Sequence, residues 1–142
     1  MSSTFIDTNI LLYSIDVRDT RKQIIAANLI DTEPFICAQN ISELINVLLN
    51  KWKYPKQNLE IIIGEILDSC YLANTSQVTY KKAFGLIKRY NLQIFDAIIV
   101  SAALDAGCSV LYTEDMQHGL VVEKKLKIQN PFLNQQYLPL TK

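Results

Sequence analysis

The sequence has few of the residues that build zinc sites and disulfide frameworks. Its 142 residues include three cysteines and one histidine, His118. The cysteines, Cys37, Cys70 and Cys108, are widely spaced and form no C-x-x-C pair. Because a structural zinc site needs a full set of Cys and His ligands at short spacings, we expect none here. Scattered cysteines are typical of free thiols in a reducing compartment, so we expect a cytoplasmic protein.

The chain also lacks a charge excess and long apolar runs. It has 14 Lys and Arg residues against 14 Asp and Glu residues, and its formal net charge is zero. A strongly basic whole domain, the simplest signature of nucleic-acid binding, is therefore excluded, although local basic patches are not. No apolar run reaches the ~18 residues of a membrane span, so we expect no membrane association. No basic N-terminal region precedes an apolar run, which argues against a signal peptide.

Linkers rich in Pro or Gly, internal repeats and low-complexity tracts are missing as well. We therefore expect residues 1–142 to form a single domain. The hydrophobic fraction of 49% is sufficient for a buried core. The tail 130–142 is rich in Asn, Gln and Pro, and we expect it to pack loosely.

Short apolar segments alternate with amphipathic segments along the chain. Apolar positions at three- and four-residue spacings predict helices, and the short apolar runs predict strands. We expect strands at 3–6, 34–37, 70–73, 109–113 and 126–129, the last as an edge strand. We expect helices at 8–13, 18–29, 39–52, 55–67, 78–90 and 94–106, the last closed by Gly107. This alternation predicts a three-layer α/β/α fold, in which helices cover both faces of a short parallel sheet.

Four acidic residues occupy unusual positions. Asp7 directly follows the first strand, and Asp115 follows the strand SVLYT closely. Glu43 borders the apolar stripe of its helix, and Asp96 lies near the start of the most apolar helix, IFDAIIVSAALDA. Parallel sheets place their sites at the carboxyl ends of their strands, where these acids can be brought together. Such carboxylates repel one another and raise each other's pKa unless a cation binds.

Each acid also has an explanation that involves no ligand. Asp7 can cap the first helix, and Asp115 suits a turn or a cap after a strand. Asp96 in a first helical turn is favoured by the helix dipole. Glu43 can form a capping box with Asn40. These explanations are independent of one another. They do not account for the fact that all four acids can be brought together at the carboxyl ends of the strands.

An all-carboxylate site favours hard metal ions. Oxygen ligands select Mg²⁺ or Mn²⁺. Such an ion can orient a water molecule, help to deprotonate it and neutralise charge on a phosphodiester under attack. No Ser or Cys nucleophile stands beside a histidine in the sequence. Hydrolysis by metal-bound water is therefore the simplest chemistry for the four acids.

Four segments of the chain resemble those of PIN-domain proteins, in particular the toxin ribonucleases of bacterial VapBC toxin–antitoxin pairs. The segments occur in the order of the family and are FIDTNILLY, SELINVL, FDAIIVSAAL and LYTEDMQHG. The resemblance runs from residue 5 to residue 119. It implies a PIN-like fold with four catalytic, metal-binding carboxylates: Asp7, Glu43, Asp96 and Asp115. It also implies that Asn9 supports the first acid and that Thr113 is a polar residue of the site.

The same resemblance implies an activity, a cofactor and partners. The activity would be endonucleolytic cleavage of RNA that depends on Mg²⁺ or Mn²⁺. The partners would be an antitoxin, which inserts a segment near the site and inhibits it, and a second copy of the chain in a homodimer. The RNA target and the cleavage site are not encoded in any visible motif.

One departure from the family pattern concerns a further acid that many members carry shortly after the fourth. This chain has Met116, Gln117, His118 and Gly119 there. Glu114 precedes Asp115 instead and can point the other way, which leaves the number of metal ions open. His118 could contact a phosphate or transfer a proton, but a solvated loop histidine is the simpler interpretation.

Other protein classes share single features with this chain. An aspartate-nucleophile phosphatase also places Asp after its first strand, but it usually carries a second Asp where this chain has Asn9. A phospho-acceptor receiver domain needs an acceptor Asp after a middle strand, which PFICAQ does not supply. A PIN domain that binds without cleaving is the third alternative.

Aromatic and basic residues alternate shortly before Pro55. Trp52 and Tyr54 lie beside Lys51 and Lys53. These aromatic rings could stack on bases while the lysines hold phosphates. The alternatives are partly buried core or interface aromatics and solvated lysines.

Overall fold

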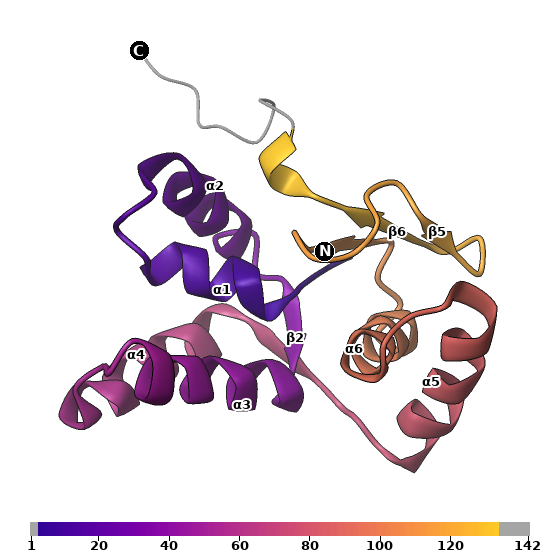
Figure 1. Ribbon diagram of the computed structural model, residues 1–142, viewed down its shortest axis with the longest axis horizontal. Coiled ribbons are helices and arrows are strands. Elements are labelled where there is room, and N and C mark those ends of the chain that lie inside the picture. The colour runs from indigo at the N-terminus through magenta and orange to yellow at the C-terminus, as the bar shows by residue number, and fades with distance from the viewer. Residues whose placement is uncertain (1–2, 134–142) are drawn as a thin grey trace.

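A six-stranded sheet forms the centre of the protein (Figure 1). The computed structural model describes residues 3–133. The strands are β1 (Thr4–Ile6), β2 (Phe35–Cys37), β3 (Tyr71–Ala73), β4 (Val110–Tyr112), β5 (Val121–Val122) and β6 (Leu126–Gln129). Their order is β3-β2-β1-β4-β6-β5, and all neighbours are parallel except β5 and β6. β1, which precedes Asp7, therefore lies between β2, which precedes the helix that carries Glu43, and β4, which precedes Asp115.

Helices cover both faces of this sheet. They are α1 (Thr8–Ile15), α2 (Thr20–Ile30), α3 (Ala38–Asn46), α4 (Lys56–Ser69), α5 (Gln77–Tyr90) and α6 (Ile94–Asp105). Figure 1 shows α5 and α6 packed together on one side, apart from α1–α4. Successive side chains of a strand point to opposite faces. Accordingly, Phe5 packs in the core beneath α5 and α6, and Ile6 packs in the core beneath α1–α4. The predicted three-layer α/β/α fold is confirmed.

The most apolar helix, α6, is buried on nearly all sides because it lies between α5 and the sheet. Residues 97–103 are all buried. Its end is closed by two backbone hydrogen bonds, from Gly107 N to Leu104 O (3.0 Å) and from Cys108 N to Ala103 O (3.0 Å). This arrangement requires a left-handed residue, and Gly107 has a φ of 76°. The predicted role of Gly107 at the end of this helix is confirmed.

Two glycine substitutions should have opposite effects on stability. Gly107→Ala is expected to lower the free energy of unfolding by about 1 kcal/mol, because a Cβ is strained at positive φ. Gly85 lies inside α5, where an added Cβ meets nothing within 4 Å. Gly85→Ala is therefore expected to raise the free energy of unfolding, by up to about 1 kcal/mol. Urea denaturation of both variants checks this, and a shift of the same sign in both would contradict it.

Three expectations need correction. β6 is not an edge strand, because it lies between β4 and β5, and β5 itself was not predicted. The helix predicted at 39–52 changes its winding, since α3 ends at Asn46 and a π-helical turn follows at Val47–Lys51. The tail 130–142 is not loose at its start, where Pro131–Leu133 forms a 3-10 turn with Pro131 and Phe132 buried. The rest of the tail, 134–142, lies outside the described residues.

No helix within residues 3–133 combines the length and the apolar character needed to cross a lipid bilayer.

Candidate functional site

The four predicted acids line one pocket at the carboxyl ends of the central strands. Asp7 follows β1, Asp115 follows β4, Glu43 lies on α3 after β2, and Asp96 lies in the first turn of α6. The pocket has a volume of about 380 Å³, and its wall also includes Asn9. Residues far apart in the sequence are therefore brought together as the parallel topology predicts.

Asp7 is the most enclosed of the four acids, with 7% of its surface exposed. Its Oδ1 accepts a hydrogen bond from Thr8 N (2.7 Å), so Asp7 caps α1. Its Oδ2 accepts a hydrogen bond from Thr113 Oγ1 (2.9 Å). The pKa of Asp7 is raised to about 6, mainly by burial and to a smaller extent by the charges of Glu43 and Asp96, while the two hydrogen bonds lower it. Asp7 therefore caps α1 and at the same time belongs to the acidic pocket.

Glu43 is held by a neighbour of Asp7 rather than by a capping box. Thr8 Oγ1 donates a hydrogen bond to Glu43 Oε1 (2.7 Å) and accepts one from Asn40 Nδ2 (3.1 Å). Asn40 Oδ1 accepts from Cys37 N (2.8 Å), so Asn40 caps its own helix with Cys37. The capping box between Glu43 and Asn40 is therefore wrong. The side chain of Glu43 is instead oriented by Thr8 on the adjacent helix.

Asp96 lies half-buried at the start of the apolar helix α6. Burial raises its pKa, and the charges of Asp115 and Glu43 raise it further. The ion pairs within residues 3–133 join other acids to other bases, and none involves any of the four pocket acids. The negative charge of the pocket is therefore not neutralised by a basic side chain of the described residues.

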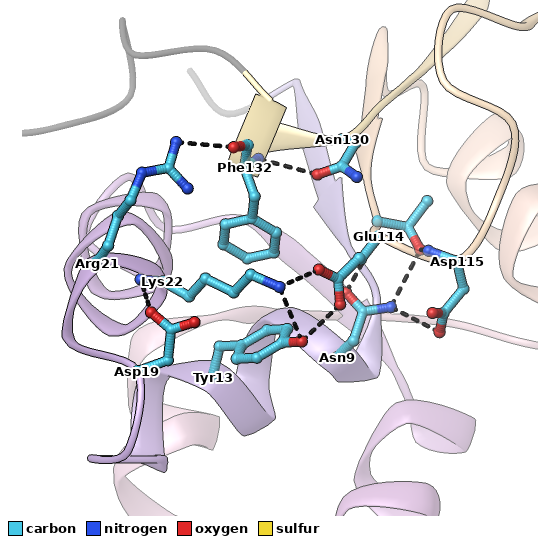
Figure 2. A network of polar contacts seen from close by, with 10 residues as sticks. Asn9, Tyr13, Asp19, Arg21, Lys22, Glu114, Asp115, Asn130 and Phe132 are labelled. Carbon is cyan, nitrogen blue, oxygen red and sulfur yellow. Dashed lines mark hydrogen bonds and ion pairs between the residues drawn. The ribbon is translucent and has the colours of Figure 1, made fainter.

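Asn9 and Thr113 connect the acids across the sheet. Asn9 Nδ2 donates to Asp115 Oδ2 (3.0 Å), as Figure 2 shows, and it also donates to Thr113 Oγ1 (3.2 Å). Thr113 Oγ1 also accepts from Asp115 N (3.1 Å). Asn9 therefore contacts the fourth acid directly, and it reaches the first acid, Asp7, only through Thr113. This differs from the expectation that Asn9 supports the first acid.

Glu114 points away from the acidic pocket, as the sequence suggested it could. Figure 2 shows its carboxylate between Tyr13 and Lys22. Tyr13 OH donates to Glu114 Oε1 (2.6 Å), and Lys22 Nζ forms an ion pair with Glu114 Oε2. The Lys22 ammonium also lies over the rings of Tyr13 (4.6 Å) and Phe132 (5.2 Å). The chain segment that carries Asp115 is therefore anchored to α1 and α2.

His118 does not line the acidic pocket. It lies exposed in a loop, where its Nδ1 accepts a hydrogen bond from Asn130 N (2.9 Å). The interpretation as a loop histidine fits this position.

Sequence reasoning missed the roles of Thr8, Asn40 and Lys22. Lys22 and Glu114 are 92 positions apart in the sequence, and no local sequence pattern predicts their contact.

The donor set of the pocket fits a hard divalent cation by charge and by chemistry. Within residues 3–133, no group of three His, Cys, Asp or Glu side chains lies close enough together to hold a metal ion as the side chains stand, so binding would require the carboxylates to move toward the ion. A carboxylate oxygen that accepts one hydrogen bond keeps a second lone pair, so Asp7 can still bind a cation. A cation would also remove the repulsion that raises the pKa of Asp7 and Asp96. Ligands that are all oxygen favour Mg²⁺ or Mn²⁺.

Comparisons with known proteins agree with this fold. The structure is similar to a toxin–antitoxin complex from Klebsiella pneumoniae, with a TM-score of 0.66 and 21% identity over 91% of this chain and 98% of that chain. It is also similar to VapBC2 from Rickettsia felis bound to a DNA fragment from their promoter, with a TM-score of 0.58 and 18% identity over 89% and 97% of the two chains. No curated protein matches the sequence. Residues 4–121 match the PIN domain, and the chain therefore belongs to the PIN-domain family.

Proposed function

We propose that this protein is the ribonuclease toxin of a toxin–antitoxin pair, and that it cleaves RNA phosphodiesters with the help of a divalent metal ion. One observation carries the proposal: four carboxylates that form no ion pair among the described residues converge on one pocket. In this proposal the negative charge of the pocket attracts a divalent cation, and a bound cation can in turn bind the phosphate of a nucleic acid. Membership of the PIN-domain family supports the same conclusion.

In this proposal the chain holds the ion and fixes the geometry around it. The ion would be held by the four pocket acids, Asp7, Glu43, Asp96 and Asp115. When bound, Mg²⁺ or Mn²⁺ supplies charge neutralisation and a more acidic water molecule. Thr113 and Asn9 keep the carboxylates of Asp7 and Asp115 in place through their hydrogen bonds. Water adds to the phosphorus and one P–O ester bond breaks, leaving a phosphate monoester on one RNA fragment and a hydroxyl on the other.

The proposal includes partners and a location. The two structural neighbours are toxin–antitoxin complexes, which supports an antitoxin as a partner of this chain. We place the protein in the cytoplasm, where RNA is accessible, and we propose a homodimer on the family resemblance. Size-exclusion chromatography with light scattering measures the oligomeric state directly.

Metal removal is the direct test of this function. Purified protein is expected to cut RNA from a broad pool in Mg²⁺ or Mn²⁺, to stop in EDTA, and to resume when excess metal is restored. Gel analysis of the RNA measures cleavage, and calorimetric titration with the metal measures metal binding. Cleavage that persists in EDTA would contradict a metal-dependent mechanism. Folded protein that binds no divalent ion and cuts no RNA would favour a PIN domain that only binds its partner.

A further inference from the structure

A groove continues from the acidic pocket along α1 and the end of α3. A second hollow of about 290 Å³ shares Asn9 and Asp115 with the acidic pocket. A third hollow of about 380 Å³ shares Lys51 and Trp52 with the second. The three hollows are therefore neighbours on one surface of the protein. An extended polymer bound at the four acids can therefore run on toward Trp52.

The charge changes sign along this groove. Its far end contains two cations, Arg18 and Lys51. Arg18 is held in a fixed orientation, because its Nε and Nη2 donate to the two carboxylate oxygens of Asp16 at 2.8 Å each. Lys51 is exposed and takes part in none of the ion pairs found among residues 3–133. Lys51 is therefore available for a phosphate, while the charge of Arg18 is balanced by Asp16.

Trp52 offers a stacking surface at the same place. It is partly buried against the core beneath α1–α4, which gives its ring a rigid support. It lines both outer hollows, so part of the ring is accessible from the groove. The guanidinium carbon of Arg18 lies 5.6 Å from the centroid of its ring. Indole rings and guanidinium planes are the surfaces on which unpaired bases stack in complexes with single-stranded RNA.

The backbone adopts an unusual conformation to place these side chains. In the π-helical turn, Trp52 N donates to Val47 O (3.0 Å), five residues back. Lys53 then adopts a φ of 53°, which is uncommon for a residue other than glycine. Single π-turns inside helices occur frequently at functional sites. The turn rotates Lys51 and Trp52 relative to a continuous α-helix and places both on the groove.

We propose that Trp52, Arg18 and Lys51 form a subsite for a nucleotide of single-stranded RNA that lies further along the groove from the scissile phosphate, with a base stacked on Trp52 and a phosphate on Lys51. The position of this subsite relative to the cleaved P–O bond rests on the proposed function. A purely structural role for Trp52 explains its partial burial. It does not explain why, among residues 3–133, a lysine without an ion pair and an oriented arginine lie on the same groove as the acids.

The sole tryptophan of the chain makes the proposal directly measurable. Single-stranded hexaribonucleotides, such as hexauridylate and hexaadenylate, are titrated into the Asp96→Asn protein in Mg²⁺, since this variant is expected not to cut the probe. Saturable quenching of the Trp52 fluorescence is expected. In the same background Trp52→Leu should weaken binding about 5- to 100-fold, measured by anisotropy of an end-labelled hexamer, and Trp52→Phe should keep most of the affinity.

Lys51→Ala provides a test that does not involve the core. It should weaken binding and reduce the slope of log Kd against log salt by about 0.7, the value for one phosphate contact to a single strand. Lys88→Ala is the matched control, because Lys88 is also exposed but lies on α5, across the sheet from the groove. It should leave affinity and salt slope unchanged.

The outcomes separate the subsite from the proposed function. Quenching that is weakened by Lys51→Ala, in a protein whose wild type cuts no RNA, would uphold the subsite and refute the cleavage. Wild-type cleavage, with no fluorescence change and with unchanged affinity in Lys51→Ala and Trp52→Leu, would overturn the subsite. The hollow around Trp52 would then be assigned to a protein contact, and the proposed function would stand.

Discussion

Replacing Asp96 by Asn is expected to lower the rate of RNA cleavage about 100- to 1,000-fold without unfolding the protein. The substitution keeps the size of the side chain but removes its negative charge from the acidic pocket. In our mechanism that charge would help Asp7, Glu43 and Asp115 to hold the metal ion, and the charges of Asp115 and Glu43 raise the pKa of Asp96 in its absence. Loss of one preorganised electrostatic group in an active site typically costs this much in rate. Single-turnover cleavage of an end-labelled RNA measures the effect.

Asp105→Asn is the matched control for this experiment. Asp105 lies at the other end of the same helix, α6, and forms an ion pair with Lys82 (2.6 Å) outside the acidic pocket. The chemical change is the same, but only a surface ion pair is lost, which costs no more than about 1 kcal/mol of stability. Cleavage should stay within about two-fold of the wild type. Equal losses of activity in Asp96→Asn and Asp105→Asn would show that the acidic pocket is not the catalytic centre.

Asp7→Asn should abolish cleavage and yet stabilise the metal-free protein. Burial, the largest cause, raises the pKa of Asp7 from 3.8 to about 6 in the folded state. The folded protein therefore holds this proton more tightly than the unfolded chain does. Consequently, the contribution of Asp7 to stability decreases as the pH rises from about 4 to about 6. At pH 7 the ionised carboxylate costs about 3 kcal/mol, at about 1.4 kcal/mol for each unit of pKa shift.

Asparagine avoids this cost but keeps only one of the two hydrogen bonds, because its amide nitrogen cannot accept from Thr113 Oγ1 as Asp7 Oδ2 does. Its side-chain oxygen can still accept the hydrogen bond from Thr8 N that caps α1. After subtraction of about 1 kcal/mol for the lost hydrogen bond, we expect Asp7→Asn to raise the free energy of unfolding at pH 7 by about 1–2 kcal/mol in EDTA. Mg²⁺ should stabilise the wild type above pH 6 and have little effect on the variant, because binding to the folded state shifts the unfolding equilibrium.

Urea denaturation between pH 4 and pH 8, carried out once in EDTA and once in Mg²⁺, measures both effects. Asp19→Asn is the control, since Asp19 caps α2 by accepting from Lys22 N (3.1 Å) at an exposed position away from the pocket. Asn and Asp are nearly equal as N-caps, so this variant should behave like the wild type. A wild-type stability that does not fall between pH 4 and pH 6 relative to Asp7→Asn would refute the proposed cost of Asp7.

The sequence was sufficient for those parts of the fold that depend on local periodicity. Apolar runs such as SVLYT and the heavily apolar segment around Asp96 have lengths that fit only one kind of element, and both were predicted correctly. The convergence of Asp7 and Asp115 followed from one topological rule, because residues that follow parallel strands meet at the same edge, whereas Glu43 and Asp96 reach that edge from helices.

The remaining features depend on contacts between distant segments. β5 consists of Val121–Val122 alone, and so short a strand exists because β6 pairs with it. The neighbours of β6 could not be deduced from its own four residues, so it was misplaced at the edge of the sheet. Likewise, Asn9 lies two residues after Asp7 in the sequence, but its side chain donates a hydrogen bond to Asp115, which follows β4. Proximity in sequence was in this case a poor guide to hydrogen bonding.

The hydrogen bonds from Thr113 to Asp7 and from Asn9 to Asp115 each join residues 106 positions apart. Closing so long a loop costs chain entropy, and contacts of this range form slowly compared with helices. The carboxylates therefore assemble only after β4 has docked beside β1. A nascent chain on the ribosome that has emerged only as far as α6 has three of the acids but neither Thr113 nor Asp115. The order of elements thus keeps the acidic pocket incomplete while most of the protein is being synthesised, next to the very RNA that a nuclease could damage.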